Sequence, residues 1–213
     1  MTDAIIIFHR HPQLGKVKTR LAKSVGDKKA LSIYKACSFY IIDHILNGPT
    51  PAYIFLSDKN DLDKSHFDTK NLLIQNGVDL GSKMSNSFSE IFSKGFKKVV
   101  IVASDAPDID NKLIQSALKS LDNKDFVLGP SVDGGYYLLG MNKFARFLFE
   151  NMTWSHGDVL ADTILKIKEK NLSCELLTNL IDIDQESDLN EWLNTEAVHK
   201  ELQDNIKKIH YFK

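Results

Sequence analysis

Short hydrophobic runs alternate with longer segments of helical periodicity along this chain. The runs are continuous and rich in β-branched residues, a pattern typical of strands buried on both faces of a sheet. Between them, apolar side chains recur at the spacing of one helix face. The predicted strands are residues 4–8, 52–56, 71–75, 99–103, 126–129, 136–141 and 173–178. The predicted helices are residues 27–46, 80–96, 110–121, 143–150, 157–170 and most of 186–206, with a short helix and loop at 58–68.

Strands that alternate with helices predict an α/β fold with a mainly parallel sheet covered by helices. Asp110 stands directly before a helical segment, where its carboxylate can accept from the free amides of the first turn. The sequence contains no internal repeat, low-complexity tract or linker-like stretch, so we expect residues 1–213 to form a single domain.

Composition limits the classes of function. The net charge of −1 gives no general attraction to nucleic acid or to an anionic membrane. No apolar run approaches the roughly 20 residues that span a bilayer, and no basic, apolar leader precedes the first strand. Cys37 and Cys174 are far apart and are predicted to be reduced thiols. These features predict a cytoplasmic protein.

Two carboxylates follow the predicted strand at residues 99–103. Ligands of such sheets bind beyond the carboxyl ends of the strands. Asp105 can bind Mg²⁺ or Mn²⁺ there, with phosphate oxygens and waters completing the octahedron; the alternative is an aspartate that only shapes the turn. For Asp108, beside Pro107, we favour the loop-shaping role.

A second loop at this edge carries Asp133, Gly134 and Gly135. Glycine lets the backbone approach a ligand closely, so Asp133 could orient a sugar hydroxyl, act as a base or reach the metal. The alternative is a simple Asp-Gly turn. Tyr136 and Tyr137 follow on a strand, which predicts that one packs in the core and the other faces the crevice.

A basic loop follows the first strand. Cationic side chains and free amides at the carboxyl end of a strand suit a diphosphate or triphosphate. The loop has neither the glycine spacing of a Walker P-loop nor a dinucleotide fingerprint, and a solvated basic loop is the alternative. Its position opposite the acidic loops favours a magnesium–phosphate complex. The candidate phosphate ligands are Arg10, Gly15, Lys16, Lys18 and Arg20.

Two later segments have weaker signals. Asp182 and Asp184 have the spacing of a D-x-D metal motif, but we favour a loop in which Asp184 or Ser187 caps the next helix. His156 is a candidate metal ligand or helix cap, although most single histidines are neither.

Several segments together resemble the bacterial DUF2064 proteins, which are glycosyltransferase-like. Residues 8–22, FHRHPQLGKVKTRLA, resemble the family's opening F-x-K-x-P-x-x-G-x-V-K-T-R-L-A. GVDLGSKM at 77–84 resembles G-x-D-L-G-x-R-M, and SDAPD at 104–108 resembles the S-D-x-P-D part of G-S-D-x-P-D. GPSVDGGYYLLG at 129–140 resembles G-P-x-x-D-G-G-Y-Y-L-x-G. Arg10 and Lys83 differ from the family's lysine and arginine but keep the charge.

The resemblance implies a three-layer α/β/α sandwich of the nucleotide-diphospho-sugar transferase (GT-A) type. Related guanylyltransferases of cofactor F420 biosynthesis and molybdenum-cofactor nucleotidyltransferases share this fold, the basic loop and a metal-binding aspartate after the fourth strand. By resemblance the basic loop holds nucleotide phosphates and Asp105 holds the metal, Mg²⁺ or Mn²⁺. Acceptor or sugar contacts are then expected from Asp133, Lys83, Gly134, Gly135, Tyr136 and Trp154.

Three functions fit these residues. The first is a metal-dependent glycosyltransferase with a nucleotide-sugar donor, in which Asp133 orients or deprotonates a small-molecule acceptor. The second is a nucleotidyltransferase, in which a phosphorylated acceptor attacks the α-phosphate of a nucleoside triphosphate. The third is a nucleotide-binding module without catalysis. The family favours the first and the dense basic loop the second.

Overall fold

The computed structural model describes residues 2–58 and 71–211. The short helix and loop predicted at 58–68 therefore lie, apart from residue 58, outside the described residues. Hydrogen bonds join the described strands into one sheet of order β3-β2-β1-β4-β6-β5-β7. The strands are β1 (Asp3–His9), β2 (Ala52–Leu56), β3 (Leu72–Ile74), β4 (Lys98–Ala103), β5 (Phe126–Pro130), β6 (Tyr136–Met141) and β7 (Cys174–Leu176).

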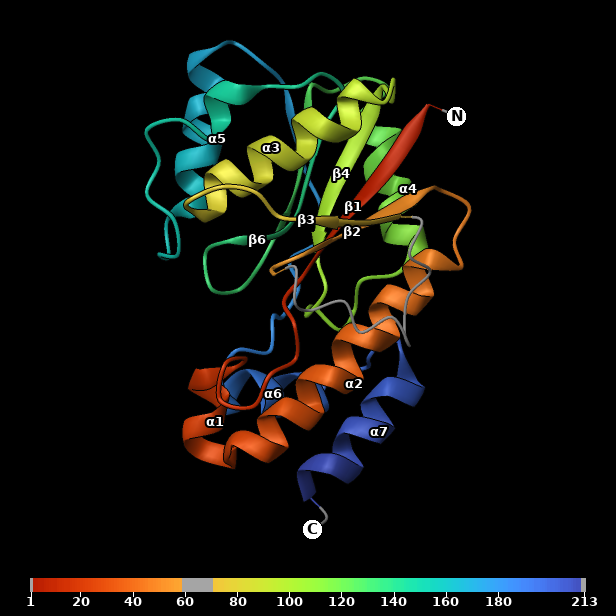
Figure 1. Cartoon of the computed structure of the whole chain (residues 1–213), viewed down its shortest axis with the longest axis vertical. Coiled ribbons are helices and arrows are strands. Elements are labelled where there is room, and N and C mark those ends of the chain that lie inside the picture. The colour runs from red at the N-terminus through yellow and green to blue at the C-terminus, as the bar shows by residue number, and fades with distance from the viewer. Residues whose placement is uncertain (1, 59–70, 212–213) are drawn as a thin grey trace.

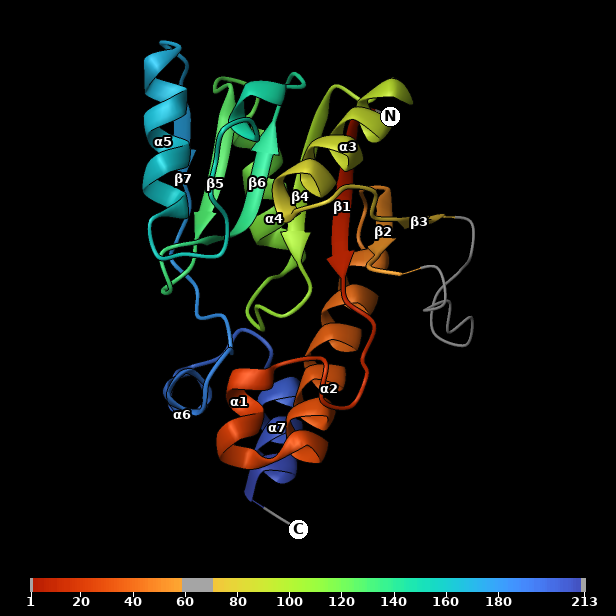
Figure 2. The same ribbon diagram turned by 60° about the vertical axis from the view of Figure 1, so that its left-hand side comes forward.

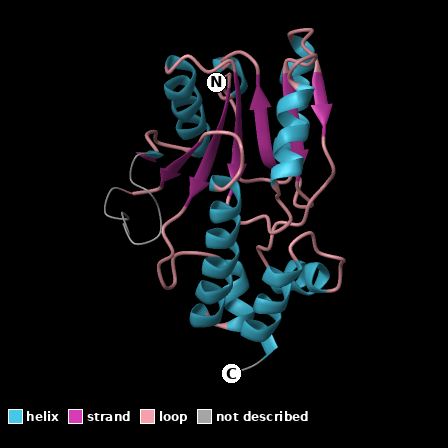
Figure 3. Ribbon diagram, turned by 90° about the vertical axis from the view of Figure 1, so that its right-hand side faces the viewer, coloured by secondary structure: helices cyan, strands magenta, loops and turns pink. Residues whose placement is uncertain are grey.

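The sheet is mainly parallel, as predicted. Only β6 runs antiparallel to its neighbours β4 and β5, and Figure 3 shows this one strand pointing the opposite way. The chain builds outward from β1 through β2 to β3, then returns to place β4 on the other side of β1. The carboxyl ends of β1 and β4 therefore flank a topological switch point, where doubly wound sheets form their ligand crevice.

Helices cover both faces of the sheet. They are α1 (Thr19–Val25), α2 (Asp27–Leu46), α3 (Leu80–Ser93), α4 (Asn111–Ser120), α5 (Val159–Glu169), α6 (Glu186–Leu193) and α7 (Lys200–Tyr211), with a short 3₁₀ helix, η3 (Arg146–Leu148). Ile5 and Ile7 of β1 pack in one core cluster with residues of α2 and α4, and Ile6 packs in the other with residues of α3. This alternation confirms the three-layer α/β/α architecture.

A group of helices extends the molecule beyond the carboxyl ends of β1 and β4. Figures 1 and 2 show α1, α6, α7 and the first turns of α2 on that side of the sheet. Their apolar faces join the same core cluster as one face of the sheet, with Leu21, Trp192 and Ile206 fully buried. The crevice at the switch point therefore lies between the sheet and this helical group.

The predicted and observed secondary structures differ mainly in the positions and lengths of helices. No helix was predicted at residues 19–25, where α1 follows directly on the basic loop. The helix predicted at 143–150 is reduced to η3. The helix predicted at 186–206 is two helices, α6 and α7. Gln203 Nε2 of α7 donates to the backbone oxygens of Trp192, near the end of α6, and of Thr195, just beyond that end.

The cap of α4 and the two cysteines agree with the predictions. Asp110 is the N-cap of α4 and accepts from Leu113 N at 2.7 Å. Cys37 is buried, Cys174 is half-buried, and both are free thiols. Within the part of the chain that the structure describes, no helix has the length and apolar character to cross a membrane.

Asp108 shapes its loop, as predicted, by joining it to the helical group. Its carboxylate accepts from Trp192 Nε1 at 2.9 Å and from Val198 N at 3.0 Å. Trp192 is fully buried, so its indole N–H depends on this acceptor.

We expect Asp108→Ala to lower the free energy of unfolding by about 1–3 kcal/mol, because the buried Trp192 N–H loses its acceptor. Urea unfolding followed by tryptophan fluorescence measures this. Asp108→Asn keeps a carbonyl oxygen that can accept one of the two bonds and should lose less. Equal stability of Asp108→Ala and the wild type would contradict the prediction.

Candidate functional site

The crevice at the switch point is a cavity of about 710 Å³. Its walls come from the ends of β1 and β4, the first turn of α3, the β5–β6 turn, the segment 154–157 before α5 and the segment 182–184 before α6. The cavity thus combines the segments that carry the candidate residues.

Most of the predicted site residues line this cavity. They are Arg10, Lys18, Arg20, Lys83, Asp105, Asp133, Gly135, Tyr136 and Trp154. Gly15 and Lys16 do not line it; they lie in an exposed turn of the basic loop, where Lys16 N donates to Gln13 O. Gly134 does not line it either. The roles of all these residues stay predictions.

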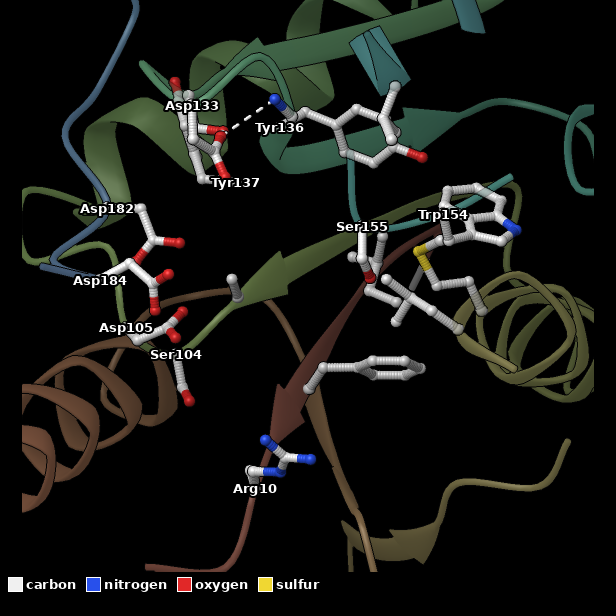
Figure 4. A pocket seen from close by; sticks show the side chains of 18 of the residues that line it. Arg10, Ser104, Asp105, Asp133, Tyr136, Tyr137, Trp154, Ser155, Asp182 and Asp184 are labelled. Atoms are coloured by element: carbon white, nitrogen blue, oxygen red, sulfur yellow. Dashed lines mark hydrogen bonds between the residues drawn. The ribbon is translucent and has the colours of Figure 1, made fainter. Parts of the chain in front are cut away.

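Three carboxylates surround the Lys18 ammonium on one side of the cavity. The distances from its Nζ are 2.9 Å to Asp105 Oδ2, 3.2 Å to Asp182 Oδ1 and 3.9 Å to Asp184 Oδ1. Figure 4 shows these three aspartates gathered at the end of β4. We call this group the acidic cluster. The Lys18 side chain is only 8% exposed, so its charge is compensated by the cluster rather than by water.

The backbone places Lys18 in the cluster. Lys18 is the residue before α1 and has a left-handed conformation, φ 46° and ψ 46°, which is uncommon for a side chain other than glycine or asparagine. Arg20 lies two residues later, mostly exposed at the mouth, with Nη1 3.1 Å from Asp184 Oδ2. The beginning of α1, a helix that the sequence analysis did not predict, therefore fixes the positions of Lys18 and Arg20.

Mutual electrostatics set the protonation of the cluster. Burial disfavours the ammonium, but the surrounding carboxylates outweigh it and raise the pKa of Lys18 above its usual range. Burial likewise opposes ionisation of Asp105, yet Lys18 lowers its pKa. For Asp182, burial and the Asp105 charge raise the pKa to about 7. One ammonium therefore does not fully compensate three carboxylates, which leaves a site suited to more positive charge.

The last of the candidate acidic segments enters the site, contrary to the interpretation we favoured. Gln185, not Asp184 or Ser187, is the N-cap of α6, so that helix-cap prediction is wrong. Asp188 accepts instead from Asp184 N and Gln185 N, at 3.0 and 2.7 Å. Because alternate residues of an extended segment face one side, the D-x-D spacing was the signal that pointed to Asp182 and Asp184.

The opposite wall contains the β5–β6 turn. Asp133 Oδ1 accepts from Ser131 Oγ and from Gly135 N, the latter at 3.0 Å. Tyr137 is buried and its hydroxyl donates to Thr178 O, whereas Tyr136 is half-buried. In Figure 4, Asp133 lies beside the two tyrosines, with the acidic cluster below it. The carboxylate of Asp133 is held by its own turn and lines the cavity.

Two glycines shape this wall. Gly134 has φ +85°, and a Cβ there would overlap the carbonyl oxygen of Gly157. Gly81, in the first turn of α3, leaves room for the indole of Trp154, which stacks on Phe149 with ring centroids 6.3 Å apart. Each glycine therefore serves a close approach that brings the segment 154–157 to the cavity.

The last two elements of the site are the start of α3 and His156. Asp79 caps α3 by accepting from Ser82 N at 2.7 Å, which places Lys83 along the cavity. His156 Nδ1 accepts from Asp158 N at 3.2 Å in the turn before α5, and the N-cap of α5 is Asp158, not His156.

His9 joins the two strands of the switch point. It is buried at the end of β1, with Nδ1 3.2 Å from Ser104 Oγ, and its ring stacks on Tyr34 with centroids 6.0 Å apart. Burial lowers the pKa of His9 to about 4, so the ring is neutral at physiological pH.

Comparisons with known proteins agree with this fold. A structure described as a putative nucleotide-diphospho-sugar transferase from Desulfovibrio desulfuricans G20 matches with a TM-score of 0.89 and 29% identity, over 98% of this chain and 97% of that one. A cytidylyltransferase structure from Leptospira borgpetersenii matches with a TM-score of 0.56 and 14% identity, over 100% and 98%, which shows the fold alone. A 2-phospho-L-lactate guanylyltransferase from Methanobrevibacter smithii is 25% identical over 91% of this chain and 88% of its own length.

The fold is thus that of the nucleotide-diphospho-sugar transferases, and these likenesses support a transferase. The model of the family described as "Uncharacterized protein conserved in bacteria (DUF2064)" matches residues 46–156. The chain belongs to the DUF2064 family, as its motifs indicated.

We expect Gly134→Ala to destabilise the protein by about 1–3 kcal/mol, because alanine combines an unfavourable φ with the overlap at Gly157. Thermal unfolding measures this. Gly135→Ala is the matched control, since Gly135 has no left-handed φ and a Cβ there would lie 3.2 Å from Asp133 Oδ1. An equal effect of the two substitutions would contradict the prediction.

We expect His9 to make folding sensitive to mild acid. The unfolded state takes up a proton near pH 6.5 and the folded state only near pH 4, so this stability is lost as the pH falls between these values. Between pH 7.5 and 4.5, the wild type should lose about 2–3 kcal/mol relative to His9→Phe. Urea unfolding of both proteins at the two pH values tests this; a difference that does not change with pH would contradict it.

Proposed function

We propose that this protein is a Mg²⁺- or Mn²⁺-dependent nucleotidyltransferase. It transfers a nucleoside monophosphate from a nucleoside triphosphate to a phosphorylated small-molecule acceptor, and pyrophosphate leaves. The observation that carries the proposal is one cavity, at the switch point, with cationic side chains next to a cluster of carboxylates. A triphosphate with its metal ion needs both kinds of group within a few ångströms.

The acidic cluster fits a divalent cation. Its donors are hard carboxylate oxygens, the ligands that Mg²⁺ and Mn²⁺ prefer, and the Lys18 ammonium already stands among them as a cation. Around the ammonium the three carboxylates are too far apart to hold a metal ion, as are all other groups of three carboxylate, imidazole or thiol side chains among the described residues, so they would have to move closer together. Asp105, Asp182 and Asp184 are the residues that would hold it. A bound Mg²⁺ or Mn²⁺ would neutralise charge on the reacting phosphates.

The cations supply the phosphate contacts. Arg10 follows β1 and Arg20 lies on α1, and both line the cavity that contains the acidic cluster. Each guanidinium can bind a phosphate by two hydrogen bonds. Lys83 lies at the amino end of α3, where free amides and the helix dipole also favour an anion. These groups can bind a triphosphate and a phosphorylated acceptor together.

The acceptor chemistry favours nucleotidyl transfer with the residues present. A phosphate oxygen of the acceptor is already ionised near neutral pH, so its attack on the α-phosphate needs no general base. Asp133, whose Oδ1 accepts two hydrogen bonds from its own turn, would then orient the acceptor rather than remove a proton.

A second candidate is a transferase with a nucleotide-sugar donor. It is favoured by Asp133 beside the half-buried Tyr136, an arrangement that suits a sugar hydroxyl above an aromatic ring. The D. desulfuricans protein, named a putative nucleotide-diphospho-sugar transferase, also supports it. In that reaction a nucleoside diphosphate leaves instead of pyrophosphate, and Asp133 has to act as the base for a neutral hydroxyl.

Thermal stabilisation by nucleotides, with and without Mg²⁺ or Mn²⁺, is the first test. We expect the largest rise in unfolding temperature with a nucleoside triphosphate plus metal, because a ligand at about 100 times its dissociation constant adds about 2.7 kcal/mol. Asp105→Asn should lose the metal-dependent part of the rise. Asp204→Asn, in the exposed face of α7, is the control and should keep it.

Pyrophosphate release from that triphosphate, measured across a panel of phosphorylated acids and sugars, then tests the chemistry. Stabilisation by a nucleotide sugar in preference to any triphosphate, with release of a nucleoside diphosphate, would replace the proposal by the second candidate. Binding that is unchanged in Asp105→Asn would contradict the metal role, and no response to any nucleotide would contradict both.

A further inference from the structure

Lys18 occupies the position where a divalent cation would have to bind. Its Nζ lies within 4 Å of all three carboxylates of the acidic cluster, although it was predicted to contact phosphate. The side chain is almost fully buried, and the residue has a left-handed backbone that aims it into the cluster. The structure therefore shows Lys18 as a partner of the three carboxylates.

An ammonium and a divalent cation cannot occupy this position together. Carboxylate oxygens lie at about 2.1 Å from Mg²⁺, closer than the 2.9 Å between Lys18 Nζ and Asp105 Oδ2. The carboxylates must therefore close in on a metal ion, and the positive charges repel each other at that separation. Metal binding between these aspartates requires the ammonium to leave.

The same cavity offers a new position for the ammonium. Lys18 lines the cavity together with Arg10 and Arg20, and its flexible four-carbon stem can turn from the carboxylates into the space that these arginines line. The nucleotide phosphates would lie there, next to the metal ion, if the proposed function is correct. A lysine suits this exchange better than an arginine, because its charge is a single compact group.

We propose that Lys18 is a place-holder for the divalent cation: its ammonium holds Asp105, Asp182 and Asp184 until the metal displaces it, and then contacts the nucleotide phosphates. The inference rests on the proposed function and adds a coupling to it. Because the metal frees a phosphate ligand, metal and nucleotide each strengthen the binding of the other. The ammonium also keeps the three carboxylates from repelling one another before the metal arrives.

The first test compares Mn²⁺ binding to the wild type, Lys18→Met and Lys23→Met without nucleotide, from the paramagnetic resonance signal of free Mn²⁺. Lys23 is an exposed lysine of α1 outside the cavity, so its substitution removes the same charge without touching the cluster. We expect Lys18→Met to bind Mn²⁺ about tenfold or more tightly than the wild type, because the competing charge is gone. Lys23→Met should bind as the wild type does.

Nucleotide binding should change in the opposite direction. With saturating Mn²⁺, Lys18→Met should bind a nucleoside triphosphate about tenfold more weakly than the wild type, because one charged contact to phosphate is lost. Equal or weaker Mn²⁺ binding by Lys18→Met would overturn the inference, and so would unchanged triphosphate binding.

A measurement on the wild type keeps the inference testable if Lys18→Met does not fold. Reductive methylation, with peptide mass spectrometry, reports the accessibility of each amine, and Lys23 is the internal reference. Lys18 should be protected without metal and react about tenfold faster once Mn²⁺ has displaced its ammonium from the cluster. Equal protection of Lys18 with and without saturating Mn²⁺ would overturn the inference.

The outcomes separate this inference from the proposed function. Metal-dependent nucleotide binding that is lost in Asp105→Asn, together with unchanged Mn²⁺ binding in Lys18→Met, leaves the proposed function standing and removes the place-holder role. If neither the wild type nor Lys18→Met binds Mn²⁺, with or without nucleotide, the acidic cluster is not a metal site and both fail.

Discussion

The ion pair between Lys18 and the three aspartates is the interaction on which the site depends. It joins segments that are far apart in the sequence: the start of α1, the end of β4 and the segment before α6. Two of its carboxylates come from a part of the chain that packs with the helical group, and the third comes from the sheet. A buried charge is stable only with such compensation, so the ion pair fixes how the helical group meets the sheet at the cavity.

The sheet supplies the rigid frame around this ion pair. Its order changes direction between β1 and β4, so the loops after these strands diverge and leave a crevice. His9 and Ser104 connect the two strand ends, and Asp108 connects the next loop to Trp192. On the opposite wall, Gly134 and Gly81 permit two close approaches that bring Trp154 to the cavity. The frame thus positions charge on one side and a mixed polar and aromatic surface on the other.

This division of the cavity suits a donor and an acceptor that bind side by side. The charged side, with its arginines and acidic cluster, matches a nucleotide with its metal ion, and the side of Asp133 and Tyr136 matches a smaller polar molecule. The fold of the nucleotide-diphospho-sugar transferases agrees with the proposed nucleotide donor. Under the proposed place-holder role, the charge of Lys18 would be part of the binding equilibrium, because the same ammonium can balance carboxylates or phosphates but not both at once.

The sequence by itself determined most of the elements and the edge at which the site lies. The hydrophobic pattern predicted the first and last residues of β2, β6 and α2 correctly, because burial against a sheet imposes a regular pattern. The strand ends followed by Asp105 and Asp133 indicated where the crevice lies. Only the tertiary structure decided which charges meet. A lysine and three aspartates have the same local chemistry whether they bind solvent, phosphate or one another, and packing of α1 and the segment before α6 against the sheet selects among these partners. For the same reason Asp184 could be mistaken for a helix cap: its local sequence allowed that role, and long-range packing gave it another.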